Sequence, residues 1–389
     1  MRVFERAVEG GRTRILILGA AHYPDAQVEK VRVPRLPDIS SAAKSCVDFA
    51  TRCIADWQDA YAKPIGTIDL LVNDAASPGG LTFTAPGGAL FPLEAPTMAA
   101  IKVARKKWME DAGPDDLLLF YCCGHGVWLP SVSKTFLASD FGADEDNPWP
   151  SAVALEDLRL GLGDFPPRAQ WLLFDCCANT PTVALEAIRA RADPLVQFQS
   201  GVRGTMEQLH GALSQVTVAA ASTGSQAFGK PGRASRFMEV LLDAFDRSGF
   251  GAQDDDGRWW LDQAGLESAM SSYALRVAPP AEEGYFTFTR LTETDAPETP
   301  RLLGREAPSQ CTLMVFSEPP QRLQQCDLEI STGSPATVIA SQPAGPHALT
   351  RFKHEVTPFL DYTCTATFPE GKLVRGRKGM PPLAKVKMA

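Results

Sequence analysis

The sequence predicts an α/β protein with a mostly parallel sheet flanked by helices, followed by a small C-terminal antiparallel β domain. Two observations predict the sheet: short apolar runs stop abruptly at small or reactive residues, and helical patterns alternate with these runs. Strands buried on both faces of a parallel sheet have such continuous apolar runs. A third observation predicts the C-terminal domain, where short apolar runs from Cys311 onward are separated by Pro and Gly turns.

Length, charge and cysteine usage exclude several classes of protein. A chain of 389 residues is too long for one compact core, so we expect a main domain and a smaller one. The net charge of −8 provides no electrostatic basis for binding nucleic acid. An N-terminal apolar run of about five residues is too short for a signal peptide or a membrane span. Nine cysteines without framework spacing predict reduced thiols in a cytoplasmic protein.

The predicted elements alternate along the first 277 residues. Ser40 or Ser41 is expected to cap the first helix and Thr97 the second, and Gly and Pro residues over 77–96 predict a hairpin. A weakly patterned loop is expected within 178–215, after a short helix. The strands are expected at 14–20, 67–72, 116–121, 170–175 and 216–222, and the helices at 40–61, 97–112, 155–162, 181–191, 236–247 and 265–277.

The predicted domain boundaries follow from composition. The elements above make a domain of residues 1–291, and a segment rich in Pro, Glu and Thr predicts a linker at 292–307. Residues 308–389 then form the β-rich domain. The chain after Gly371 is basic, and we expect a frayed, solvated end there.

Two of the predicted strands end in residues that can carry out chemistry. The first is followed by Cys122, Cys123, Gly124, His125 and Gly126, and the second ends in Asp175, Cys176 and Cys177. Ligands and reacting groups in open α/β sheets lie at the carboxyl ends of the strands. If these two strands are neighbours, an imidazole and a thiol face each other across one cleft.

These residues have the parts that a cysteine peptidase requires. Cys177 precedes an expected helix start at Thr180 and Pro181, and a helix N-terminus and a nearby imidazole both lower the pKa of a thiol. The backbone N–H groups of Gly126 and Cys177 could stabilise an oxyanion. Because adjacent strand residues point to opposite faces, only one of Cys176 and Cys177 can meet His125.

A structural role and a metal-binding role are the alternatives to this interpretation. A single histidine after a strand, or a single buried cysteine, is more often structural than functional. A zinc site is the other alternative, but adjacent cysteine pairs lack the usual spacing between paired zinc ligands. The candidate zinc ligands would be Cys122, Cys123, His125, Cys176 and Cys177.

A family resemblance extends to about Leu291. The runs FYCCGHG and LLFDCCAN resemble the histidine and cysteine motifs of caspase-like (clan CD) cysteine peptidases, nearest to the bacterial caspase-like and metacaspase-type proteases. The run VTVAAASTGSQAFG resembles the strand of the small-subunit half of that family. The resemblance implies that His125 is the base, Cys177 the nucleophile and Gly126 an oxyanion donor, and it leaves Cys176 for core packing.

The same resemblance implies a substrate preference. Asp175 stands two residues before Cys177, where metacaspases have an acid that lines the first specificity pocket. A carboxylate there favours Arg, then Lys, and repels Asp. Asp48 is a candidate for a second pocket acid, and the alternative role of Asp175 is to cap a backbone turn. Ala178 and Asn179 depart from the commoner motif, which leaves the neighbouring subsites open.

Regulation and partners are expected by analogy with the family. The expected function is a triggered endopeptidase in bacterial defence or cell death, with a protein or peptide substrate, no cofactor, and an activating partner bound through residues 308–389. Self-cleavage is expected within 189–215, which contains Arg189, Arg191 and Arg203. An acidic stretch could bind calcium, although a solvated loop is favoured; its members are Asp140, Asp144, Glu145 and Asp146.

Two alternative functions stay open from the sequence. One is a non-catalytic protein that keeps the fold and binds a partner through its β domain. The other is a separase-like protease, which would lack a strand at 216–222.

Overall fold

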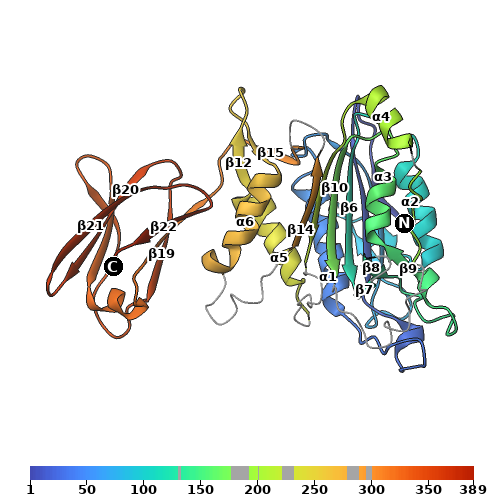
Figure 1. Ribbon diagram of the computed structural model, residues 1–389, viewed down its shortest axis with the longest axis horizontal. Coiled ribbons are helices and arrows are strands. Elements are labelled where there is room, and N and C mark those ends of the chain that lie inside the picture. The colour runs from blue at the N-terminus through green and yellow to red at the C-terminus, as the bar shows by residue number, and fades with distance from the viewer. Residues whose placement is uncertain (130–132, 177–191, 200, 221–231, 278–288, 295–299) are drawn as a thin grey trace. The chain divides into compact units, whose positions relative to one another are not determined.

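The computed structural model describes two compact units of the chain (Figure 1). Unit 1 is Met1–Glu239 with Tyr285–Leu303, and unit 2 is Val240–Gly284 with Gly304–Ala389. Within these ranges the structure describes all residues except 130–132, 177–191, 200, 221–231, 278–288 and 295–299. The predicted linker at 292–307 includes residues of two strands, β14 (Thr289–Thr294) and β15 (Leu303–Arg305).

Unit 1 contains a seven-stranded, mostly parallel sheet in the order β1-β3-β2-β6-β10-β11-β14. The five central strands run parallel to one another, and the two outer strands are antiparallel to their neighbours. This confirms the predicted fold class. The strands are β1 (Arg2–Glu5), β2 (Thr13–Ala20), β3 (Ile65–Asn73), β6 (Leu117–Gly124), β10 (Ala169–Cys176), β11 (Ser214–Ala219) and β14 (Thr289–Thr294).

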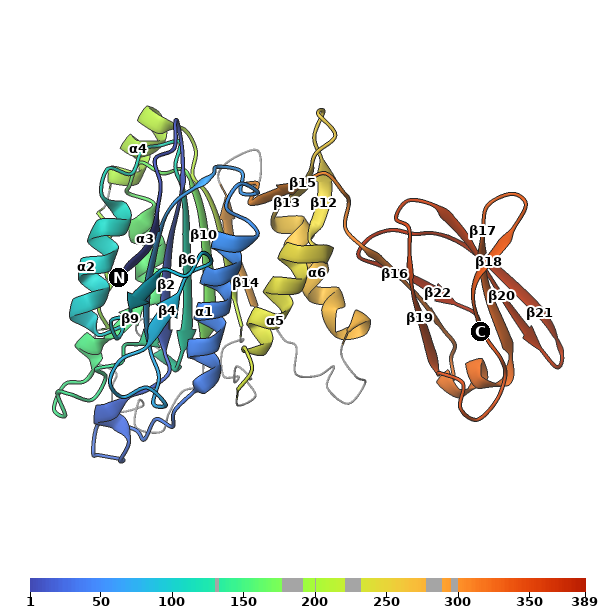
Figure 2. The same cartoon turned by 180° about the vertical axis from the view of Figure 1, so that it is seen from behind.

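Helices cover both faces of this sheet (Figure 2). Neighbouring residues of β6 show the two layers, because successive strand side chains point to opposite faces. Phe120 packs against Trp108 of α2, with ring centroids 6.2 Å apart, whereas Tyr121 packs against Phe49 of α1 at 5.3 Å. The helices of unit 1 are α1 (Ser40–Ala55), α2 (Met98–Met109), α3 (Leu155–Leu162) and α4 (Val202–His210), and α5 (Arg236–Asp243) begins in this unit.

The helix caps only partly follow the sequence prediction. Thr97 caps α2 by accepting a hydrogen bond from the N–H of Ala100 at 3.2 Å, as expected. The prediction of Ser40 or Ser41 as the cap of α1 is wrong, since Ile39 holds the N-cap position without a side-chain hydrogen bond. Ser41 is instead buried inside the helix.

Short antiparallel strands surround the carboxyl end of the sheet. The predicted hairpin within 77–96 is present as β4 (Thr82–Thr84) and β5 (Leu90–Pro92). A three-stranded sheet that the sequence did not predict follows His125 directly; it consists of β7 (Gly126–Leu129), β8 (Ser133–Leu137) and β9 (Ala152–Ala154). The chain therefore leaves the main sheet at His125 and pairs with β8 from the next residue onward.

Unit 2 contains a helical part and a β-rich part. The helical part has the π-helical turn η4 (Ala244–Ser248), α6 (Gln263–Arg276) and a sheet of β12 (Phe250–Gln253), β13 (Trp259–Leu261) and β15 (Leu303–Arg305). The β-rich part has sheets in the orders β19-β16-β22 and β18-β17-β20-β21. Its pairs are antiparallel except β16 with β22. These strands are β16 (Cys311–Phe316), β17 (Asp327–Thr332), β18 (Thr337–Gln342), β19 (Arg351–Val356) and β20 (Asp361–Phe368), followed by β21 and β22.

Two sequence predictions about irregular segments are wrong. The basic end after Gly371 is not frayed, because β21 (Gly371–Lys378) pairs with β20 and β22 (Leu383–Lys387) pairs with β16. Ala384, Val386 and Met388 alternate into the core, a period-two pattern that the intervening lysines obscure. The loop expected after residue 191 includes α4, and the helix predicted at 181–191 lies outside the described residues.

Candidate active site

The ends of β6 and β10 lie side by side at the carboxyl end of the main sheet. The two strands are adjacent and parallel, as the sequence analysis required, and Gly124 is paired with Cys176. The next residue after Gly124 is His125, and the next after Cys176 is Cys177. Cys177 lies outside the described residues, as does the predicted helix start at Thr180 and Pro181.

His125 is held by a backbone carbonyl from a distant loop. Its Nε2 lies 2.7 Å from the carbonyl oxygen of Pro37. A carbonyl oxygen can only accept, so Nε2 carries the hydrogen and Nδ1 of the neutral ring keeps its lone pair. Burial lowers the pKa of His125, while the Pro37 carbonyl and the Asp38 carboxylate oppose that shift. The imidazole is therefore mainly neutral at pH 7 and can accept a proton.

Gly126 offers a backbone donor at the same place. Gly126 is paired with Phe136 across β7 and β8, and the N–H of Leu137 donates to the carbonyl of His125 at 3.0 Å. In an antiparallel ladder this pattern makes Gly126 and Phe136 a pair that does not exchange hydrogen bonds. The N–H of Gly126 consequently points away from β8, which suits an oxyanion donor.

Asp175 lies on the α1 face of the sheet and is 2% exposed. Its Oδ2 accepts hydrogen bonds from the hydroxyl of Tyr121, at 2.9 Å, and from the hydroxyl of Ser235. Burial raises the pKa of Asp175, and hydrogen bonds from Ser235, Cys123 and Tyr121, together with the positive charge of Lys134, counteract that shift. All three donors are uncharged groups, so they solvate the carboxylate without neutralising its charge.

Ser235 ties Asp175 to the start of α5. Its Oγ also accepts from the N–H of Met238 at 3.0 Å, and its own N–H donates to Ser45 of α1 at 2.8 Å. The arrangement is compatible both with a pocket acid and with the alternative in which Asp175 stabilises a backbone turn. Tyr121 and Ser235 were not singled out from the sequence, because their contact with Asp175 depends on strand pairing and on a helix 60 residues away.

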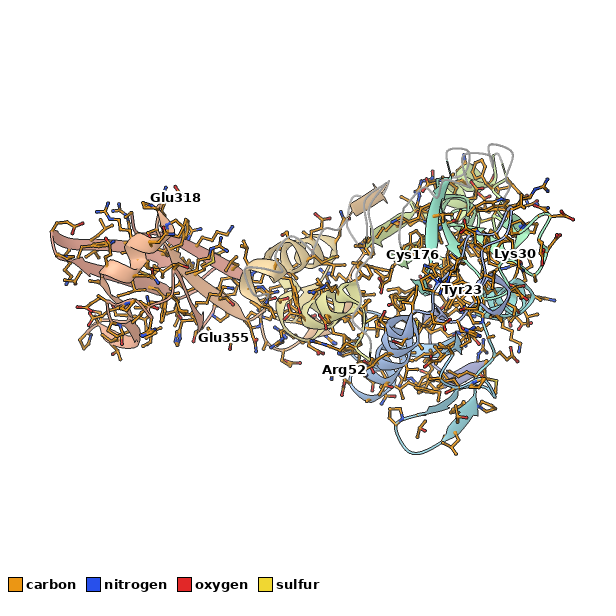
Figure 3. The ribbon with its side chains drawn as sticks, turned by 90° about the horizontal axis from the view of Figure 1, so that it is seen from below. Tyr23, Lys30, Arg52, Cys176, Glu318 and Glu355 are labelled. Atoms are coloured by element: carbon orange, nitrogen blue, oxygen red, sulfur yellow. The ribbon has the colours of Figure 1, made fainter. Side chains whose placement is uncertain are left out.

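The neighbouring cysteines separate onto two faces of the sheet. Cys176 is fully buried in the core between the sheet, α2 and α3, in agreement with its predicted packing role (Figure 3). Cys122 belongs to the same core, whereas Cys123 is hydrogen-bonded to Asp175 on the opposite face. Burial raises the pKa of both Cys122 and Cys123. Among the described residues, no group of three potential metal ligands comes together.

The other acidic candidates have partners of their own. Asp48 is on α1, where its carboxylate lies 2.9 Å from Nζ of Lys44. In the acidic stretch, Asp140 accepts from the N–H of Met98 at 3.0 Å and Glu145 lies 3.0 Å from Lys30. Asp144 accepts the N–H of Asp146, also at 3.0 Å. The residues of this stretch thus cap α2, form a turn and contact the loop after β2.

Two further findings bear on the class of protein. Within the described ranges, no helix is long and apolar enough to cross a membrane. Neither the protein-family models nor the curated proteins compared with the chain match it.

Proposed function

We propose that this protein is a caspase-like cysteine endopeptidase in which His125 and Cys177 form the catalytic dyad. The register of β6 and β10 carries the proposal: Gly124 and Cys176 are partners, and the residues that follow them in the chain are the base and the nucleophile. The joint occurrence of a histidine and a cysteine directly after paired residues of two adjacent parallel strands favours a dyad over two unrelated structural residues.

The reaction follows from the chemistry of these groups. Neutral His125 accepts the thiol proton of Cys177, and the thiolate attacks the scissile carbonyl carbon. The resulting oxyanion accepts hydrogen bonds from the N–H groups of Gly126 and Cys177. The imidazolium then protonates the leaving amine as the C–N bond breaks, and water hydrolyses the thioester. The Pro37 carbonyl supports this sequence by stabilising the protonated ring and by keeping Nδ1 unprotonated beforehand.

The proposed specificity is for Arg, then Lys, before the cleaved bond. The hydrogen bonds from Tyr121 and Ser235 stabilise the carboxylate form of Asp175, and a substrate guanidinium would pair with it. Asp175 is the proposed acid, and Asp48 stays a candidate for a second one. β11 follows β10 in the sheet, and its absence would have favoured the separase-like alternative.

The C-terminal strands supply the proposed recruitment domain. Its core residues, from Cys311 to Met388, form a cluster of their own. A partner bound there would act as the trigger in a defence or cell-death response, in a cytoplasm that keeps the described cysteines as free thiols.

The test is a fluorogenic peptide panel with Arg, Lys or Asp before the cleaved bond, assayed with and without calcium. Wild type is expected to cleave the Arg peptide fastest, and Cys177→Ala and His125→Ala to cleave none. Cys176→Ser is the matched control, because a neighbouring core thiol is changed but the dyad is kept. Labelling by an arginyl electrophile is expected at Cys177. A wild type that neither cleaves nor is labelled would favour the non-catalytic alternative.

A further inference from the structure

We propose that Tyr23 is a positioning residue that holds the His125 segment in its catalytic geometry; this rests on the proposed function. The hydroxyl of Tyr23 accepts a hydrogen bond from the backbone N–H of His125 at 2.8 Å and donates one to the carbonyl of Leu137 at 3.3 Å. One hydroxyl thus joins the residue before β7 to the last residue of β8. Both the imidazole and the N–H of Gly126 depend on that backbone.

The ring of Tyr23 also supports the imidazole. The two ring centroids are 5.1 Å apart and the planes are tilted by 51°. Tyr23 is fully buried. A Cβ atom at Gly124 would lie 2.9 Å from the Tyr23 hydroxyl oxygen, so the residue before His125 has to be glycine for Tyr23 to approach. The glycine and the tyrosine form one packing arrangement around the base.

The loop that carries Tyr23 is itself anchored to the sheet. Asn73, at the end of β3, accepts the N–H of Ala21 at 3.0 Å and donates to the carbonyl of His22 at 2.6 Å. The same loop carries Pro37. Tyr23 therefore fixes the main chain of His125 while Pro37 fixes its ring, and the two constraints come from one anchored segment.

The competing explanation is that Tyr23 only fills the core, so the test needs a buried tyrosine that is not near the site. Tyr61 is suitable, because it is 2% exposed and its hydroxyl lies 3.3 Å from Sγ of Cys53. Tyr23→Phe removes two buried hydrogen bonds and Tyr61→Phe removes one buried polar contact, so both variants should lose stability, but only Tyr23→Phe removes hydrogen bonds to the His125 segment.

Two readouts are compared between these variants. For Tyr23→Phe, kcat on the Arg peptide is expected to fall between about tenfold and a hundredfold, with KM within about twofold. The ¹⁵N NMR signals of the imidazole are expected to show loss of the single Nε2–H tautomer. The signals of His125 are identified among the five histidines by their absence in His125→Ala. Tyr61→Phe is expected to change neither readout.

The NMR readout separates failure of this proposal from failure of the proposed function. If wild type has no peptidase activity, a changed His125 tautomer in Tyr23→Phe alone still supports the positioning role. An unchanged tautomer and kcat in Tyr23→Phe would overturn it, and so would equal losses of kcat in both tyrosine variants.

Discussion

Asp175 accepts hydrogen bonds from two hydroxyls and a thiol, groups that carry no positive charge. Burial removes the hydration of this carboxylate, which is why its pKa is raised, and the positive charge of Lys134 opposes that shift together with the hydrogen bonds. A substrate guanidinium would pair with the carboxylate directly. The alternative is a structural role, in which buried Asp175 serves only to fix the start of α5.

Asp175→Asn separates these two roles. If Asp175 pairs with the substrate, kcat/KM for the Arg peptide is expected to fall by about 100-fold or more, because one partner of a charge pair is lost. The rate of Cys177 alkylation by iodoacetamide should stay within about threefold, since amide and carboxylate are similar in size. Asp48→Asn, measured in the same way, tests the second candidate acid. Retained Arg preference in Asp175→Asn would contradict the pocket role.

The pH dependence follows from His125, whose pKa burial lowers from its ordinary 6.5. The base is neutral down to that lowered pKa, so the acidic limb of kcat/KM should have its midpoint below pH 6.5. Between the two pKa values the unfolded chain binds a proton more readily than the folded one, so stability declines as pH falls through this interval. Urea unfolding from pH 7 to 5 should show a smaller decline in His125→Gln. A midpoint above 6.5 would contradict this assignment.

At the scale of single elements, β6 has to end in a residue without a side chain. A Cβ atom at Gly124 would meet the carbonyl oxygen of Ala20 and the Tyr23 hydroxyl, both at 2.9 Å, and Phe136 at 3.0 Å. Three neighbours from three segments crowd this position, so relaxation of one of them would not be enough.

Gly124→Ala is therefore expected to lower the unfolding free energy by about 1–3 kcal/mol, the usual cost of overpacking a filled site. It should also reduce kcat, because the backbone before His125 shifts. Gly113→Ala is the control, since its Cβ would meet no atom within 4 Å. Chemical denaturation and the Arg-peptide assay measure both effects. Equal unfolding free energies of the two variants would contradict the predicted crowding of a Cβ atom at Gly124.

At the scale of the whole molecule, the described residues from 192 to 210, which follow the candidate nucleophile, are packed unequally. Leu195 and Val196 are buried in the core of unit 1. By contrast, α4 has no buried residue, and its Arg203 pairs with Glu207 at 3.3 Å. A helix without buried contacts unfolds locally at little cost, which makes it accessible to a peptidase cleft.

Among the described residues of 189–215, Arg203 of α4 is therefore the expected site of self-cleavage. Incubation of the wild-type protein should give two fragments that meet between residues 203 and 204, as identified by intact-mass analysis. The Cys177→Ala variant should remain uncleaved. Arg203→Gln should resist cutting but hydrolyse the Arg peptide at the wild-type rate. Arg189 and Arg191, outside the described residues, are the other candidate sites. Cleavage of Cys177→Ala as fast as wild type would rule out self-processing.

The local pattern of the chain determined the strands, most of the helices and the places where chemistry could occur. Short continuous apolar runs bounded by turn residues are typical of strands buried on both faces, and each run stops where the sheet meets solvent. That reasoning sufficed for the fold class, whereas the pairing of β6 with β10 was only a condition in the sequence analysis and is shown by the structure. It failed for β21, which has no buried residue, and for β22, whose exposed lysines conceal the alternation of an outer strand.

Only the tertiary structure decided which groups surround the candidate site. Tyr23 and Pro37 contact His125 although they precede it by 102 and 88 residues in the sequence. Ser235 contacts Asp175 across a separation of 60 residues. Such contacts have no local signature, because a carbonyl or a hydroxyl acquires its role only when a loop is anchored beside it. The protonation states of His125 and Asp175 were undecided for the same reason: burial and hydrogen bonding, which set the pKa values, exist only in the folded chain.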